Sequence, residues 1–328
     1  MSVLSLRDLR VTYHTSEGGV PAVRGVDMDV AKGEVLGLAG ESGCGKSTIA
    51  GSILRLLPSK TKVDGQILLE GEDVLALSPG RLRAVRWAGA SIVFQGAMHA
   101  LNPVQRVGDQ IAEAIIVHRQ AGEKEARVRV GALLEQVGLP ARRMQDYPHE
   151  LSGGQKQRVM IAMALACSPS LIIADEPTTA LDVMVQAQVL RLMKELQRDL
   201  GLSMIFITHD LSVLVETSDR LAIMYAGKII EEGPAEMVFK TPQHPYTEAL
   251  AAAFPEIGDD RFRRKPMGLG GDPPDPANLP SGCSFHPRCP KAFDDCPTVV
   301  PELYPAGEGR RAACLLMPAA KTQAGAQA

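Results

Sequence analysis

Short apolar runs alternate with amphipathic stretches over the first three quarters of the chain. The segments "EVLGLAG" (34–40), "SLIIADEP" (170–177) and "SMIFITHD" (203–210) are apolar, of strand length, and end in glycine or in polar residues. This pattern is typical of strands buried on both faces. The segment from about Val104 to Gly138 is expected to be helical, because apolar residues recur there with helical spacing. Strands that alternate with helices predict an α/β core with a mostly parallel sheet.

Three further patterns complete the core. In 185–201 the apolar positions Val185, Val189, Leu192 and Leu196 share one helical face, and Gly201 should end the helix. The first 35 residues roughly alternate between apolar and polar, which predicts short strands separated by turns. The stretch "RLAIMYAGKIIEEG" predicts a hairpin that turns at Ala226–Gly227.

The composition changes near residue 255, where prolines and glycines become frequent, as in "GLGGDPPDPANLPSG" (268–282). Such a segment has too few apolar residues for a large core of its own. The last stretch, "PAAKTQAGAQA", is expected to be disordered. We therefore expect a main domain over 1–255 with a helical subdomain at about 96–165, a loop-rich extension over 256–318 and a tail over 319–328.

The totals exclude some classes of protein. The chain has 328 residues, a formal net charge of -3 and a pI of about 6.2, whereas a nucleic-acid binder usually carries a basic surplus. No apolar run approaches the roughly 18–20 residues that span a bilayer, and the first residues lack the apolar core of a signal peptide. We expect a cytosolic protein whose cysteines stay reduced and serve as metal ligands before they form disulfides.

The segment "GESGCGKS" has the spacing of a phosphate-binding loop, G-x-x-x-x-G-K-[ST], between a predicted strand and a predicted helix. Its glycines allow a tight turn in which consecutive N–H groups face a phosphate, and the N-terminus of the helix adds partial positive charge. Lys46 can reach the β- and γ-phosphates of a nucleotide, and the Ser47 hydroxyl can bind Mg²⁺. The expected ATP-binding residues of the loop are Gly40, Glu41, Ser42, Gly43, Cys44, Gly45, Lys46, Ser47 and Thr48.

Two acidic residues end the buried strand of 170–177. Charges at the edge of a core are costly without a partner, and Mg²⁺ with ATP would supply one. Asp175 can hold the metal, and Glu176 can polarise a water for attack on the γ-phosphate. The two carboxylates extend the expectation from nucleotide binding to nucleotide hydrolysis.

The segment "LSGGQKQR" (Leu151–Arg158) resembles the signature motif of ABC-type ATPases, and other family elements follow in the family's order. The resemblance covers residues 3 to about 240. It implies a P-loop NTPase fold with a β-subdomain and a helical subdomain, Glu176, Gln95 and His209 as catalytic residues, and Ser47, Gln95 and Asp175 at the Mg²⁺. It also implies a D-loop at Ala180, Leu181 and Asp182, an aromatic residue under the adenine at Tyr13, and signature residues at Leu151, Ser152, Gly153, Gly154 and Gln155.

The signature motif has a physical logic. Ser152 and the amides of Gly153 and Gly154 open a helix and so form a second anion site. In the family this site faces the γ-phosphate held by another subunit, so that ATP lies between two subunits arranged head to tail. Hydrolysis then removes the shared contacts and opens the dimer.

The tail carries a closer resemblance. The segments "TPQHPYTEALAAAFP" (241–255) and "GDPPDPANLPSGCSFHPRCPKAFDDC" (271–296) resemble the C-terminal extension of the dipeptide, oligopeptide and nickel importer ATPases, and "LLPSKTKVDGQILLEGEDVLAL" (56–77) resembles the D-type member of the usual D/F pair. The resemblance implies a peptide importer with an F-type ATPase partner, two membrane permease subunits and an extracytoplasmic solute-binding protein. The chain would then lie at the cytoplasmic face of the inner membrane as a peripheral subunit.

Gly96–Ala97 stand where many members have Asp-Pro. This departure leaves oligosaccharide or nickel-chelate import open as alternatives. An exporter ATPase and a soluble ABC ATPase that acts on ribosomes or DNA are less favoured. The tail resembles that of importers, and the chain has one cassette, no heptad run and no basic surplus.

Four cysteines follow in the extension, at Cys283, Cys289, Cys296 and Cys314, with five, six and seventeen residues between them. Four thiolates in a loop-rich cytosolic segment suit a [4Fe–4S] cluster or zinc, although the tight pairs of most zinc sites are missing. A metal would also hold together a segment with little core. The resemblance favours the iron–sulfur cluster, and unliganded or disulfide-bonded cysteines remain the third possibility.

Overall fold

The computed structural model describes residues 1–16, 18–94, 100–118, 121–179, 181–253 and 270–320. The chain divides into two compact units. The first unit comprises Met1–Ser5, Asp29–Glu34 and Leu68–Ile207, and the second comprises Leu6–Met28, Val35–Ile67 and Thr208–Ala328. Among the described residues, no helix combines the length and the apolar character needed to cross a membrane.

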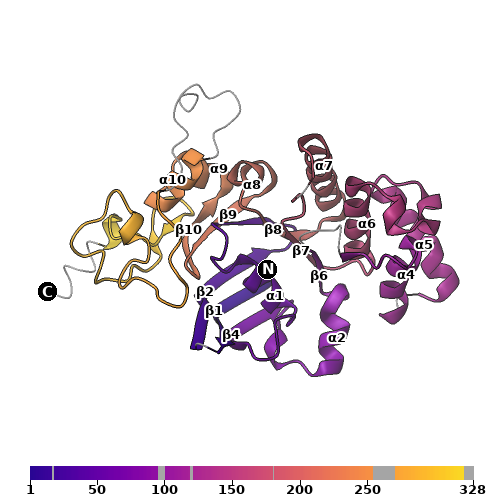
Figure 1. Ribbon diagram of the computed structural model, residues 1–328, viewed down its shortest axis with the longest axis horizontal. Helices are drawn as coiled ribbons and strands as arrows, with labels where there is room; N and C mark the ends of the chain where they lie inside the picture. The colour runs from indigo at the N-terminus through magenta and orange to yellow at the C-terminus, as the bar shows by residue number, and fades with distance from the viewer. Residues whose placement is uncertain (17, 95–99, 119–120, 180, 254–269, 321–328) are drawn as a thin grey trace. The chain divides into compact units, whose positions relative to one another are not determined.

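The first unit contains a parallel sheet with the strand order β8-β7-β6 (Figure 1). Its strands are β6 (Ala90–Val93), β7 (Leu171–Asp175) and β8 (Ser203–Ile207). All residues of β7 and β8 are buried, which confirms the two buried strands that the apolar runs predict. The helices of this unit are α2 (Pro79–Ala88), α4 (Val107–Val117), α5 (Glu123–Gln136), α6 (Gly153–Leu165) and α7 (Val183–Leu200).

The helical predictions hold with one refinement. Helix α7 ends at Gly201, which takes the left-handed conformation with φ 62°, and Val189, Leu192 and Leu196 are buried on one face. The stretch from Val104 to Gly138, predicted as helical, contains two helices, α4 and α5, and Gly122 stands at the start of the second. The apolar spacing that indicates a helix does not show where one helix ends and the next begins.

The second unit contains the strand order β11-β12-β10-β9-β3. Strand β3 (Val35–Ala39) pairs in parallel with β9 (Arg220–Tyr225), and β9 forms an antiparallel hairpin with β10 (Lys228–Pro234). Ala226 and Gly227 have φ values of 46° and 79°, so the predicted turn is confirmed. The helices of this unit are α1 (Lys46–Ile53), α8 (Leu211–Thr217), α9 (Ala235–Lys240) and α10 (Pro245–Ala253).

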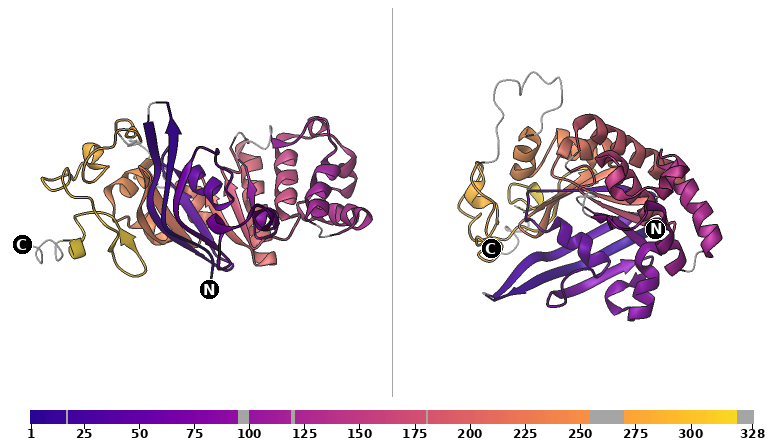
Figure 2. Two further views of the ribbon diagram at one scale, coloured as in Figure 1. Left: turned by 90° about the horizontal axis from the view of Figure 1, so that it is seen from below. Right: turned by 45° about the vertical axis from the view of Figure 1, so that its right-hand side comes forward.

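A separate four-stranded sheet has the order β2-β1-β4-β5. Strands β1 (Ser2–Thr15) and β2 (Gly18–Ala31) each have 14 residues and run side by side (Figure 2). The prediction of several short strands in this region is therefore wrong in length. Gly25, with φ 81°, lies inside β2 and does not interrupt it. Strands β4 (Lys62–Leu69) and β5 (Glu72–Asp73) complete the sheet.

Backbone pairing connects the extension to the sheet of the second unit. Strand β12 (Arg311–Ala312) pairs with β10, and β11 (Tyr304–Pro305) pairs with β12. A small apolar cluster of the extension includes residues of these two strands. It consists of Tyr304, Ala312, Cys314, Met317 and Ala320. The extension thus has a modest core and also continues an existing sheet.

Phe285 anchors the cysteine-bearing loop of the extension, which precedes β11, to the rest of the second unit. Its ring is 2% exposed, and its centroid lies 5.3 Å from that of Tyr225 and 5.4 Å from that of Tyr246, both at steep interplanar angles. Edge-to-face aromatic pairs at these distances stabilise beyond the area that they bury. Phe285 therefore provides an apolar contact between the cysteine-bearing loop and both strand β9 and helix α10.

We expect Phe285→Ala to lower the free energy of unfolding by about 3 kcal/mol or more, because it empties a fully buried aromatic site. Urea unfolding followed by near-ultraviolet circular dichroism, to which Tyr225 and Tyr246 contribute, measures the loss. Phe293 lies in the same extension but is 38% exposed, so Phe293→Ala should cost less than about 1 kcal/mol. Equal losses in the two variants would contradict the anchoring role of Phe285.

Candidate functional site

The segment Gly40–Gly45 forms a loop between β3 and α1 whose backbone admits only glycine at two places. Gly40 and Gly45 have φ values of 152° and 109°. A Cβ atom at Gly40 would meet the carbonyl oxygen of Met224, and one at Gly45 would meet that of Ala22. The turn that the glycine pattern predicts is therefore present, with its backbone tightly enclosed.

Lys46 is the first residue of α1, and its ammonium group folds back over the loop. The Nζ atom donates to the carbonyl oxygen of Gly40 at 2.6 Å and to that of Glu41 at 2.9 Å, and the residue is only 6% exposed. The positive charge of Lys46 is thereby held against the loop, and the N-terminus of α1 follows the loop directly. Both the ammonium charge and a helix N-terminus favour anions.

The neighbouring loop residues differ in exposure. Ser47 is exposed, so its hydroxyl is accessible, whereas Cys44 is buried. Burial raises the pKa of the Cys44 thiol, although Lys46 acts in the opposite direction. Cys44 is thus a small buried residue of the loop. Tyr13 and Thr48 lie together, with 3.2 Å between the phenol oxygen and Oγ1.

In the first unit the signature segment opens α6. Ser152 is the N-cap residue, and it forms a capping box with Gln155: the Gln155 N–H donates to Ser152 Oγ at 3.4 Å, and the Ser152 N–H donates to Gln155 Oε1 at 3.0 Å. Leu151 is buried beside it, while Ser152 itself is exposed. Gly154 packs against Val185, where a Cβ atom would clash. The helix thus begins at an exposed cap residue, and helix N-termini in general favour anions.

The two acidic residues lie at the end of β7, as the sequence predicts. Asp175 is 8% exposed. Glu176 has φ 46°, which is uncommon outside glycine, and its N–H donates to the Ile207 carbonyl at 2.8 Å. Its Oε2 accepts from the Thr179 hydroxyl at 2.9 Å. A non-glycine residue held in this conformation costs free energy, and such residues concentrate at functional sites.

Three further residues of the expected site, Leu181, Asp182 and His209, lie within the described part of the chain. Asp182 is the N-cap residue of α7 and accepts from the Val185 N–H at 2.9 Å, and the Leu181 N–H donates to the Thr178 carbonyl. His209 follows β8 and is exposed. Gln95 and Ala180 lie outside the described residues. The loop of Gly40–Gly45 belongs to the second unit, as do Tyr13 and His209. The signature segment belongs to the first unit, as do Asp175, Glu176 and Asp182.

The four cysteines of the extension line one small pocket, together with Phe285 and His286 among others. Burial raises the pKa of the Cys283 and Cys289 thiols and raises that of Cys314 to about 11. Within the described part of the chain, however, no group of three or more His, Cys, Asp or Glu side chains is arranged to hold a metal ion. The structure thus brings the four residues to one pocket but does not support the expected metal centre.

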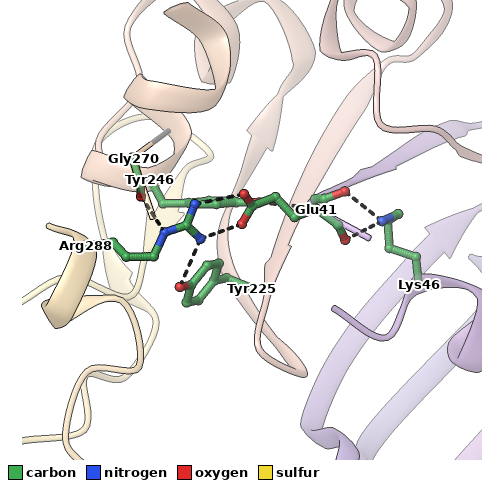
Figure 3. Close-up of polar contacts among 7 residues, drawn as sticks. Glu41, Lys46, Tyr225, Tyr246, Gly270 and Arg288 are labelled. Carbon is green, nitrogen blue, oxygen red and sulfur yellow. Dashed lines mark hydrogen bonds and ion pairs between the residues drawn. The ribbon is translucent and has the colours of Figure 1, made fainter. Parts of the chain in front are cut away.

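The sequence does not indicate the partners of the Glu41 side chain. Arg288 of the extension and Tyr246 of α10 bind this loop residue, and Tyr225 of β9 contacts Arg288 (Figure 3). Arg288 and Glu41 are 247 positions apart. No local spacing signals such a pair; only the clustering of charged and aromatic residues around "HPRC" could have drawn attention to it.

Two family models match parts of this chain. The family model "ABC transporter" matches residues 23–179, and "Oligopeptide/dipeptide transporter, C-terminal region" matches residues 230–296. The dimeric structure of the ATP-binding cassette MJ0796 bound to ADP and Pi is similar with a TM-score of 0.64 and 29% identity, over 71% of this chain and 98% of that one. The structure of cbiO1 from Clostridium perfringens is similar with a TM-score of 0.62 and 32% identity, over 73% and 91%.

Relatives match over nearly the whole length. The dipeptide transport ATP-binding protein DppD of Bacillus subtilis is 47% identical over 303 residues, which are 91% of this chain and 90% of the relative. The oligopeptide transport ATP-binding protein AppD of the same organism is 44% identical over 319 residues, 96% and 97% of the two chains. The chain belongs to the ABC transporter family, among the ATP-binding proteins that carry the oligopeptide/dipeptide transporter C-terminal region.

Proposed function

We propose that this chain is the ATP-hydrolysing subunit of an ABC importer that takes up di- and oligopeptides. The observation that carries the proposal is the loop of Gly40–Gly45 with the Lys46 ammonium held against its carbonyl groups. The relatives named for dipeptide and oligopeptide transport support the cargo. They favour peptides over the oligosaccharide and nickel-chelate alternatives.

The loop suits a phosphate chain, because its glycines allow a turn whose N–H groups can face an anion and Lys46 adds a positive charge. Lys46 can exchange these carbonyl partners for β- and γ-phosphate oxygens. Ser47, Asp175 and Gln95 would hold Mg²⁺, which when bound neutralises charge on the phosphate oxygens. Tyr13 would lie under the adenine.

Hydrolysis requires a base and a second subunit. Glu176 would polarise the attacking water, with its carboxylate oriented by the bond from Thr179 and by its strained backbone. His209 and Gln95 would complete the catalytic set. The open N-terminus of α6 at Ser152–Gly154 would bind the γ-phosphate held by a partner ATPase, so that two chains enclose ATP head to tail.

The proposal implies an assembly. An F-type ATPase would supply the second cassette, and two permease subunits would supply the membrane pathway. An extracytoplasmic solute-binding protein would deliver the peptide. The chain would then lie as a peripheral subunit on the cytoplasmic face of the membrane.

We expect Glu176→Gln to lower the ATP hydrolysis rate of the assembled transporter by about 100-fold or more, since it removes the general base. The change is isosteric, so the Kd for ATP should stay within about twofold. Phosphate release and equilibrium nucleotide binding measure the two quantities. Glu195→Gln, an exposed site on α7, is the matched control, and hydrolysis by Glu176→Gln at the control's rate would refute the assignment of the base.

We propose also that Cys283, Cys289, Cys296 and Cys314 hold a [4Fe–4S] cluster, with zinc as the alternative. The support is that the four residues line one pocket, and that cysteine thiolates are the usual ligands of such clusters. Binding would deprotonate thiols whose pKa burial now raises. When bound, the group would join loop segments of the extension that share a small core.

Chain purified without oxygen should therefore contain about four irons and four sulfides and absorb broadly in the visible range. Cys296→Ser should lose most of this iron. Cys167→Ser, which changes a buried cysteine outside the extension, should keep it. Zinc without sulfide would establish the alternative, and a chain without either metal would contradict both.

A further inference from the structure

Arg288 links the extension to the phosphate loop by an ion pair with two hydrogen bonds (Figure 3). It ends the 3-10 helix His286–Arg288, and its guanidinium donates from Nη1 to Glu41 Oε2 at 2.7 Å and from Nη2 to Glu41 Oε1 at 2.9 Å. The two side chains are only 8% and 21% exposed. This two-point geometry is stronger and more directional than a surface ion pair.

The guanidinium is also held in place by other groups. Its Nε donates to the Gly270 carbonyl at 2.9 Å, and Nη1 lies 3.4 Å from the hydroxyl of Tyr225. The hydrogen bonds to Glu41 raise the pKa of Arg288 even though burial acts against it. Each nitrogen of the guanidinium therefore has a fixed partner. The guanidinium cannot rotate without breaking its two hydrogen bonds to the Glu41 carboxylate.

Glu41 is the second residue of the phosphate loop, and its backbone is part of the anion site. Its N–H donates to the phenol oxygen of Tyr246 at 2.9 Å, and its carbonyl accepts from Lys46 Nζ at 2.9 Å. Arg288 holds the side chain of the same residue. One loop residue is thus fixed at three points, and one of these is the lysine that would meet the phosphates.

The segment that carries Arg288 is itself well anchored. The neighbouring Phe285 is buried among Tyr225 and Tyr246, and the Cys283 N–H donates to the Cys296 carbonyl at 2.8 Å. A second contact joins the same region to the core, since Arg24 donates to Ser284 Oγ at 2.9 Å. Arg288 therefore reaches Glu41 from a fixed base, which is what a positioning role requires.

We infer that Arg288 is a positioning residue for the ATP site, which through Glu41 fixes the loop in the shape that presents Lys46 to the phosphates. The inference rests on the proposed ATP binding by this loop. It makes the folding of the extension a condition for tight nucleotide binding. Arg288 acts on ground-state binding and not on the attacking water, so its loss should raise KM for ATP and leave kcat largely unchanged.

Arg288→Ala in the full-length chain should raise the Kd for ATP with Mg²⁺, measured by titration calorimetry, by about three- to tenfold. Arg311→Ala is the matched control. Arg311 belongs to the same extension and also donates twice to a carboxylate, at 2.7 and 2.5 Å from Glu232, but Glu232 lies on β10 outside the loop. The control should bind ATP as the unmodified chain does.

Two further variants separate positioning from general stability. Arg288→Lys keeps the charge but not the paired bonds, so it should recover part of the affinity. Glu41→Gln removes the loop's half of the pair with little change of shape, and it keeps the inference testable if Arg288→Ala does not fold. The double variant with Arg288→Ala and Glu41→Gln should bind ATP no more weakly than the weaker-binding single variant, because both changes remove the same contact.

An Arg288→Ala chain with unchanged Kd, or an equal loss of affinity in Arg311→Ala, overturns the positioning role. A fall in kcat with unchanged KM in the assembled transporter overturns it as well. If the unmodified chain binds no ATP, the proposed function itself fails, and this result is distinct from a difference between variants.

Discussion

The site depends on one electrostatic arrangement: the Lys46 ammonium held against the carbonyl groups of Gly40 and Glu41. A loop that binds phosphate must turn its N–H groups inward before any anion is present, and the carbonyl groups of such a turn need a partner. Lys46 supplies that partner at the first turn of α1. The glycines, the enclosing carbonyl groups of Ala22 and Met224, and the strand before the loop all serve to keep this turn.

The extension gives the same loop a second support. Arg288 of the extension binds the Glu41 side chain, and Phe285 of the extension packs on Tyr246 of α10, which binds the Glu41 backbone. The extension also adds strand β12 to the edge of the sheet that contains β3. A segment that looks from its composition like a loop-rich appendage is therefore part of the nucleotide-binding unit.

The sequence predicts best what depends on neighbours in the chain. The loop of Gly40–Ser47, the buried strand that ends in Asp175 and the cap of α7 at Gly201 follow from short spacings, and the structure has the expected local form at each. The resemblance to ABC ATPases names roles for Ser152 and Glu176 that no spacing gives. The strain at Glu176, with φ 46°, has no signal in the sequence.

What the sequence misses depends on distant contacts or on chain continuity. The pair of Arg288 with Glu41 joins positions 247 residues apart, and the length of β1 and β2 depends on pairing that an alternating pattern does not specify. The cysteine spacing leads to the expectation of a metal centre. In the structure the four cysteines, two buried and two partly exposed, share one pocket, and no metal-binding group is found among the described residues. Spacing shows which residues are available but not how folding orients them.

The central claim is that ATP hydrolysis at this loop drives the import of peptides. The most direct measurement is ATP hydrolysis by the complete transporter in vesicles with its solute-binding protein, given in turn short peptides, oligosaccharides and nickel chelates. The account predicts that peptides raise the rate and that the other two classes leave it at the basal level. Stimulation by oligosaccharides or nickel chelates alone would contradict it.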